Sequence, residues 1–284
     1  MREFPSWFHI PLADWIDRVA DWVTTEGAVI FGAISDVLFI LLLRIEQFLL
    51  WLPWPVVIVV VAALAWRVVG PLLAGGVVAG LLFIGALGLW PHAMATLTLV
   101  TGATVLATML GLPVGIAMSR SQVVEGVIKP LLDLMQTMPS FVYLIPALML
   151  FGLGRVPALI ATLVYSIPPV IRLTNLGIRQ VEPSVVEASR AFGSTKMQVL
   201  MWVQMPLALP TIMAGINQTI MMALAMVVIA SMIGAGGLGD EVLRGIGRLE
   251  VGRGFQGGIS IVIMAIIIDR ITAGLGQRSQ HDSA

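Results

Sequence analysis

Few side chains in this sequence have the types and spacing that catalysis requires. Lys196 follows a Gly-Ser-Thr triplet, but the full G-x-x-x-x-G-K-[ST] phosphate loop occurs nowhere, so any ATP would have to be hydrolysed by another chain. His9, His92 and His281 are too far apart to match a metal-binding spacing. Neither G-x-S-x-G nor H-E-x-x-H occurs. We therefore expect no catalytic residue, no metal site and no cofactor bound by this chain.

The polar stretch around Glu187 has the start and stop signals of two short helices. Ser184 and Glu187 have the S-x-x-E spacing of a capping box, which predicts a helix that begins near Val185. Gly193 comes about two turns later, where a left-handed residue would end that helix. Ser194 is then placed to cap the next helix. The pattern predicts a short helix on the membrane surface, a sharp corner and a rise into the bilayer.

The composition of the chain predicts its fold class, and thereby the kind of elements that flank this stretch. Hydrophobic residues make up 58% of the chain and charged residues only 11%, whereas a soluble domain carries about 25% charged residues. We predict an all-α, polytopic helical membrane protein. The formal net charge of zero gives no electrostatic reason to expect a nucleic-acid partner.

Charge-poor runs predict the membrane spans. No Asp, Glu, Lys or Arg lies between Val68 and Ser119, a run that needs more than one span, and Trp90-Pro91-His92 supplies a break. Gly111 and Gly115 in this run form a G-x-x-x-G pattern, which favours close packing of one helix against another. Seven spans are predicted: 54–69, 71–90, 94–118, 138–153, 157–178, 205–232 and 256–275.

The first fifty residues are harder to interpret. Trp15, Val19 and Trp22 recur at helical spacing with acidic residues largely off that stripe, which predicts an amphipathic helix at the membrane interface over 1–26, with an ordinary surface helix as the alternative. Residues 28–52 are long enough to span but carry several charged residues, which are costly in hydrocarbon. We expect an interfacial or re-entrant helix there, with a full span as the alternative.

Lysine and arginine positions predict the orientation. With the C-terminus inside, nine fall on the cytoplasmic side and four on the outer side. The cytoplasmic set is Arg67, Arg120, Lys129, Arg172, Arg179, Arg190, Lys196, Arg270 and Arg278, and the outer set is Arg155, Arg244, Arg248 and Arg253. The stretch around Glu187 then faces the cytoplasm. Seven spans leave the N-terminus outside, and an eighth at 28–52 would move it inside.

The same stretch resembles the cytoplasmic motif of binding-protein-dependent ABC importer permeases, E-A-A-x3-G-x9-I-x-L-P. Its spacing is intact, with conservative departures at three positions, and it is carried by Glu187, Ala188, Ser189, Gly193, Val203, Met205 and Pro206. Three further segments resemble the osmoprotectant branch of that family, namely 136–154, 210–239 and 243–252. The resemblance covers about 53–277.

This resemblance implies a type I importer permease fold in a bacterial inner membrane. The implied cargo is a compatible solute such as glycine betaine, proline betaine, proline or choline. The implied partners are a second copy of the chain, two ABC ATPase subunits that bind ATP and Mg, and an extracytoplasmic substrate-binding protein. The expected organisation is an N-terminal region (1–52), two peripheral helices (53–92), a core permease domain (93–276) with a coupling loop (180–204), and a polar tail (277–284).

The resemblance and the residue chemistry together give three candidate sites. The ATPase-coupling residues are expected to be Ser184, Glu187, Ala188, Ser189, Arg190, Ala191, Phe192, Gly193 and Lys196. Candidates for the translocation pathway or gate are Thr104, Thr108, Asn217, Met221 and Met222, although packing and hydrogen bonds across helices would equally explain them. Candidates for receptor docking are Asp240, Glu241, Arg244 and Arg248, which a solvated loop would also explain.

Two other classes of protein compete with the importer permease. A secondary carrier or channel would transport its solute without nucleotide, and it would place ionisable residues inside its spans. The clearest such pair, Asp269-Arg270, lies near the end of the last predicted helix. A membrane enzyme would turn over substrate without a partner, and the absence of catalytic motifs disfavours it.

Overall fold

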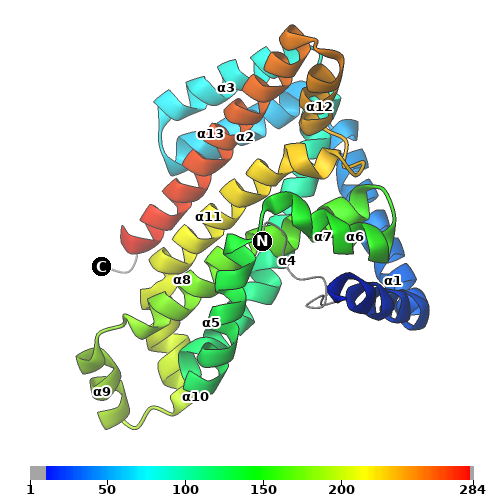
Figure 1. The fold of residues 1–284 in the computed structure, drawn as a ribbon. Coiled ribbons are helices and arrows are strands. Elements are labelled where there is room, and N and C mark those ends of the chain that lie inside the picture. The colour runs from blue at the N-terminus through cyan, green and yellow to red at the C-terminus, as the bar shows by residue number, and fades with distance from the viewer. Residues whose placement is uncertain (1–10, 282–284) are drawn as a thin grey trace, which may run out of the picture.

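A computed structural model describes residues 11–281 of the chain, with side chains through Gly276 (Figure 1). All secondary-structure elements of the described part are helices, which confirms the all-α class. Its elements in chain order are α1 (Leu12–Trp51), α2 (Trp54–Val68), α3 (Pro71–Ala86), α4 (Trp90–Arg120), α5 (Gln122–Thr137), η1 (Ser140–Tyr143), α6 (Leu144–Phe151), α7 (Arg155–Ser166), α8 (Pro168–Arg179), α9 (Pro183–Ala191), α10 (Lys196–Gln198), the π-helical η2 (Val199–Gln204), α11 (Met205–Ser231), α12 (Leu238–Arg248) and α13 (Val251–His281).

The N-terminal region is one continuous helix rather than two. α1 has 40 residues and is long and apolar enough to cross a membrane. This differs from the predicted separation of 1–26 from 28–52 and favours the alternative of a full span. Of the charges in its second half, Glu46 pairs with Arg155 of α7, which removes part of the cost of placing it among apolar helices. Residues 1–10 lie outside the described part of the chain.

The other predicted spans differ in detail. Five helical segments of the described chain are long and apolar enough to cross, or six if one bent pair is counted. That pair is Gln122–Thr137 and Ser140–Phe151, bent by 112°, where a single span at 138–153 was predicted. Pro139 explains the break, because the residue before a proline is pushed out of helical geometry and Met138 is extended. α2 and α3, at 15 and 16 residues, are shorter than a typical span of about 20.

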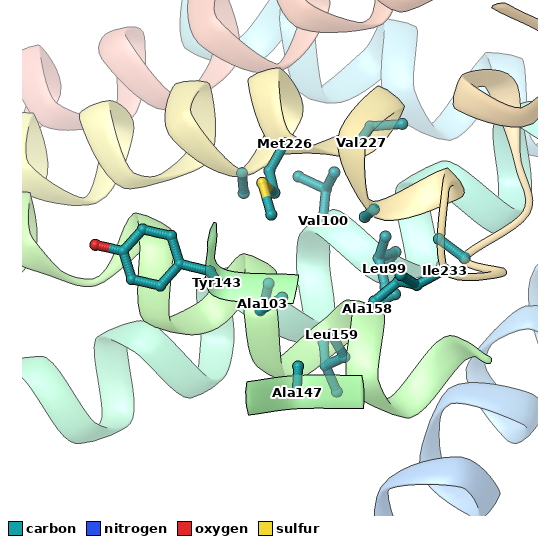
Figure 2. Packing of buried hydrophobic residues seen from close by; sticks show 14 of the residues in the cluster. Leu99, Val100, Ala103, Tyr143, Ala147, Ala158, Leu159, Met226, Val227 and Ile233 are labelled. Atoms are coloured by element: carbon teal, nitrogen blue, oxygen red, sulfur yellow. The ribbon is translucent and has the colours of Figure 1, made fainter. Parts of the chain in front are cut away.

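The main core lies where α4, α6, α7 and α11 meet. Figure 2 shows Val100 and Ala103 of α4, Leu159 of α7 and Met226 of α11 converging on one another. A second apolar cluster joins α2 and α3 to α13 and the start of α4. The long helices therefore form one bundle, with α2 and α3 along its α13 side (Figure 1).

Glycines bring α4 and α8 unusually close. A Cβ atom on Gly111 would lie 2.5 Å from Val170 Cγ1, and one on Gly115 would lie 2.7 Å from the Ile171 carbonyl oxygen. Both distances are too short for a real contact, so only glycine fits. The predicted packing role of the G-x-x-x-G pattern is confirmed.

α9 and α12 lie at opposite ends of the bundle (Figure 1). α11 runs between them: its first residue follows the α9–α10 corner, and its last precedes the loop into α12. One membrane-crossing helix therefore separates the two candidate partner surfaces.

Candidate functional site: a surface corner and a buried clamp at opposite ends

The nine predicted coupling residues come together in one corner at the α9 end. Six lie in α9, Phe192 and Gly193 form the turn, and Lys196 starts α10. No residue of α9 is buried. The Phe192 side chain is 92% exposed and Trp202 in η2 is 79% exposed. Two large aromatic side chains therefore project from a polar corner.

Gly193 ends α9 as predicted. Its φ is +87°, a left-handed conformation that glycine adopts without strain. The Gly193 N–H donates to the Arg190 carbonyl at 2.9 Å, and the Ser194 N–H donates to the Ser189 carbonyl at 3.2 Å. These two bonds are the Schellman pattern that closes a helix C-terminus.

The predicted caps are wrong in position. α9 begins at Pro183, and Glu182 is its N-cap without a side-chain hydrogen bond, so Ser184 and Glu187 form no capping box. The reason is Pro183: its fixed φ suits the first helical position, and it holds the preceding residue in an extended conformation. The capping box belongs to the next helix. Thr195 Oγ1 accepts from the Gln198 N–H at 3.4 Å, and Gln198 Oε1 accepts from the Thr195 N–H at 2.8 Å, so Thr195 rather than Ser194 is the cap.

The corner is tied to the bundle at two points. Arg120, the last residue of α4, donates to the Lys196 carbonyl oxygen at 3.0 Å. The π-helical η2 runs directly into α11 and buries Val199 and Leu200. A displacement of α9 would therefore be transmitted to the ends of both α4 and α11.

The α12 end is built in the opposite way. Glu241, only 6% exposed, accepts from Arg253 Nε at 2.6 Å and from Arg253 Nη2 at 3.1 Å. His92 Nε2 lies 3.3 Å from the same carboxylate, and Thr96 Oγ1 accepts from the Leu238 N–H at 2.8 Å. We call Thr96, His92, Glu241 and Arg253 the α12 clamp, because they fix this helix to α4 and α13.

The electrostatics of the α12 clamp favour an ionised Glu241. The hydrogen bond from Arg253 is the largest influence and lowers the pKa of Glu241 below its ordinary 4.5, while burial acts in the opposite direction. The charges of Arg253, His92 and Arg244 lower the pKa further. Glu241 is therefore a buried anion held by its own chain.

The predicted docking residues differ in exposure. Arg244 and Arg248 are exposed, and Arg244 pairs with Asp240 at 2.7 Å across one helical turn. Glu241 is buried and does not reach the outer surface. Sequence reasoning missed Thr96 and Arg253 as its partners, and it considered His92 only as part of the break between two spans and as a histidine without a metal-binding spacing. No local signal connects Glu241 with a histidine so distant in the sequence.

The predicted pathway residues do not form one cluster. Asn217 Nδ2 donates to Asp269 Oδ1 at 2.8 Å, and Thr272 donates to Asn217 Oδ1, so this amide bonds across helices. Thr104 is buried and Met221 is exposed. Thr108 and Met222 are half-buried. Among the described residues there is no group of three or more His, Cys, Asp or Glu side chains that could hold a metal ion.

Comparisons with known proteins identify the family. Residues 107–281 match the model described as "Binding-protein-dependent transport system inner membrane component". The chain is 49% identical over 271 residues to the "Glycine betaine/proline betaine transport system permease protein ProW" of Escherichia coli, covering 95% of this chain and 77% of that protein. It is 46% identical over 280 residues to the "Glycine betaine/carnitine transport permease protein GbuB" of Listeria monocytogenes, covering 96% and 98%.

A solved structure shows the same fold. A chain of the MetNI methionine ABC transporter, in inward-facing conformations, superposes with a TM-score of 0.60 at 19% identity, covering 65% of this chain and 93% of that one. The family model covers more than half of the sequence and agrees with the long apolar helices described above. The chain therefore belongs to the family of binding-protein-dependent transport system inner membrane components, as a multi-pass permease subunit of an ABC importer.

Proposed function

We propose that this chain is the permease of an ATP-driven importer for glycine betaine, proline or a related quaternary ammonium compatible solute, and that two copies form the pathway. The names of its relatives support the solute class, since the proteins from Escherichia coli and Listeria monocytogenes are named as permeases for glycine betaine with proline betaine or carnitine. A third relative, 46% identical, is named "Glycine betaine transport system permease protein OpuAB" in Bacillus subtilis.

The observation that carries the proposed coupling is the open surface of α9. Its side chains are not buried by the rest of the chain, and Phe192 projects from the turn that follows. A helix that its own chain leaves uncovered is suited to a groove on a separate ATPase subunit, which would hold ATP and Mg. Exposed aromatic side chains are typical anchors of such interfaces.

The mechanism follows from the connections of this corner. Closure of two ATPase subunits around ATP would move α9, and Arg120 and η2 would pass that movement to α4 and α11. Nucleotide would thereby favour one of two bundle conformations through its differential binding to the two states. Hydrolysis would return the bundle to the other conformation.

The outer end would receive the solute-binding protein. The exposed Arg244 and Arg248 on α12 offer charges to such a receptor, and charge pairs of this kind chiefly set register and association rate. The buried Glu241 would contribute indirectly, because it fixes α12 in position through Arg253.

Glu187→Arg tests the coupling. Glu187 is exposed and makes no side-chain hydrogen bond in the described structure, so its reversal should leave membrane insertion intact. We expect at least a tenfold loss of ATP-driven uptake in vesicles with the ATPase and receptor present. Gly193→Trp should have the same effect, but its positive φ means that the corner itself would change.

The matched control is Gln122→Arg, which adds a positive charge at an exposed site at the start of α5. It should keep uptake within about twofold of the unmodified chain, because it lies outside the corner. Undiminished uptake by Glu187→Arg would contradict the coupling role. Uptake by the purified chain without ATPase or nucleotide would instead support a secondary carrier or channel.

A further inference from the structure

α5 and α8 share a row of charged and amide side chains that the coupling and docking sites do not use. On α5, Glu125, Lys129 and Asp133 are spaced four residues apart and so lie on one helical face. On α8, Arg172, Asn175 and Arg179 are spaced three and four residues apart and also lie on one helical face. We call these six residues the α5–α8 charge ladder.

Two sets of side-chain contacts join α5 and α8 within the charge ladder. Arg179 Nη2 lies 2.6 Å from Glu125 Oε2, and Asn175 Nδ2 donates to Glu125 Oε1 at 3.3 Å. Arg172 Nη2 donates to Asp133 Oδ1 at 2.5 Å. The order of the pairs shows that the two helices run antiparallel along this row.

The Asp133–Arg172 pair lies within two candidate membrane spans, of which one is Arg155–Arg179 and the other is the bent pair Gln122–Thr137 and Ser140–Phe151. Arg179 is at the C-terminal end of the first of these spans. Arg172 comes seven residues earlier, which places it about 10 Å further along the helix axis at 1.5 Å per residue. Asp133 lies eight residues after Glu125, about 12 Å along α5 by the same rise.

The charge ladder is nevertheless not buried by its own chain. The Asp133 side chain is 57% exposed and the Arg172 side chain 34% exposed. Lys129 and Gln136, on the same face of α5, are also exposed. Charged side chains at this depth do not face hydrocarbon, because their desolvation is too costly; they face a bundle interior or a water-filled cavity.

The nearly opposite face of α5 provides the contrast, because most of its residues are two positions from those of the charge ladder, about 200° around the helix. Val123, Val127, Leu131 and Leu134 are exposed by 78%, 67%, 49% and 56%, and all four are apolar. This stripe suits lipid or protein, whereas the charge ladder suits water. Two exposed faces of one helix therefore point to two different surroundings.

Resting on the two-copy pathway proposed above, we propose that the α5–α8 charge ladder lines the aqueous passage and that its Asp133–Arg172 pair contacts a zwitterionic solute. A solute with one carboxylate and one cationic group can pair with both residues at once. Its carboxylate would contact Arg172 in place of Asp133, and its cation would contact Asp133 in place of Arg172. A solute with a single charge leaves one member unpaired in a poorly solvated site, which is unfavourable.

Cysteine labelling tests the passage, because the chain has no cysteine of its own. Single cysteines would replace Lys129, Asp133 and Gln136 on the ladder face, and Val127, Leu131 and Leu134 on the apolar stripe. Reaction with a membrane-impermeant sulfonate thiol reagent would be followed in inside-out vesicles that contain the full complex. We expect at least tenfold faster labelling on the ladder face. Lys129→Cys and Gln136→Cys leave the Asp133–Arg172 pair intact, so the comparison survives if Asp133→Cys fails to fold.

Protection tests the zwitterion assignment. Glycine betaine should slow the labelling of Gln136→Cys at least threefold, whereas choline at the same concentration, with the same quaternary ammonium group but no carboxylate, should not. Equal labelling of both α5 faces would overturn the passage assignment. Equal protection by the two solutes, or none by glycine betaine, would overturn the solute contact. ATP-driven uptake by the unmodified chain in the same vesicles is a separate readout, so failure of the proposed importer function would be recognised independently.

Discussion

The two ends of the bundle hold a short helix, α9 or α12, in opposite ways. α9 buries none of its residues and is held chiefly by its connections to α10 and η2. α12 buries Leu238, Gly239, Glu241 and Gly245, and its first turn is bonded to α4 and α13. The surface of α9 is left uncovered by its own chain, whereas the position of α12 is set by contacts within the chain.

This contrast predicts where substitutions affect folding and where they affect coupling. Changes in the α12 clamp should lower the free energy of unfolding, because they break contacts that exist in the isolated chain. Changes on the exposed surface of α9 should leave stability unchanged and alter only what the complex does. Three substitutions test this contrast, in order of decreasing effect on stability.

Glu241→Gln should have the largest effect. Removing the charge deprives Arg253 of its buried partner, and breaking a fully buried pair typically costs about 3–5 kcal/mol. Because Arg253 is 31% exposed and still pairs with Glu250, we expect a loss at the lower end, about 3 kcal/mol. Thermal unfolding of the purified chain in detergent would measure the loss. Glu250→Gln is the matched control, because Glu250 is 45% exposed and lies 3.4 Å from the same Arg253. A change below about 1 kcal/mol is expected there, and equal effects of the two variants would contradict the α12 clamp.

The same pair predicts a pH dependence. Because the folded state lowers the pKa of Glu241, its stabilisation is fully present above the unfolded value of 4.5 and is lost as the pH falls through the folded value. The stability difference between the unmodified chain and Glu241→Gln should therefore shrink below that pH. A difference that stays constant down to acid pH would show that the carboxylate charge does not stabilise α12.

Gly245→Ala should have the next largest effect. The added Cβ atom would lie 2.4 Å from the Gly254 nitrogen, a backbone atom that cannot rotate away, so α12 must move off α13. Overpacking of this kind typically costs 1–3 kcal/mol, and we expect about 2 kcal/mol. Gly247→Ala is the matched control, since nothing lies within 4 Å of its Cβ position on the same helix. It should be neutral or stabilise by up to about 1 kcal/mol.

Phe192→Ala should have the smallest effect on stability. Its side chain is 92% exposed, so truncation should change the free energy of unfolding by less than about 0.5 kcal/mol. The affinity of the ATPase subunit for the permease should nevertheless fall at least fivefold. Co-purification of the two over a series of dilutions in detergent would measure it. A large loss of thermal stability with unchanged ATPase binding would reverse the proposed distinction between the two ends.

Local patterns predicted local structure well. The charge-free runs located most of the apolar helices, the position of Gly193 located the corner, and the spacing of Gly111 and Gly115 identified a close helix contact. Each of these signals depends on residues within a few turns of one another. The misplaced cap has an equally local cause, because Pro183 overrides the S-x-x-E pattern.

Contacts between residues that are far apart in the sequence could not be predicted from it. Glu241 was expected to be an outer-surface charge, because nothing near it in sequence shows that His92 and Arg253 surround it. Arg172 and Lys129 contributed only to the orientation count, since their shared face depends on how α5 folds back against α8. The bend at Pro139 decides that arrangement, and a charge-poor run alone does not show whether a helix continues through a proline.

The π-helical segment between the corner and α11 holds one residue more than an ordinary α-helical turn would. Deletion of a single residue from 199–204 would therefore let the segment rewind as α-helix and leave α9 and α10 facing nearly the same way around the α11 axis. The same deletion within the α-helical part of α11 has no such turn to absorb it, and at 3.6 residues per turn it would rotate the corner by roughly 100°. This junction thus carries a spare residue whose loss would not redirect the corner.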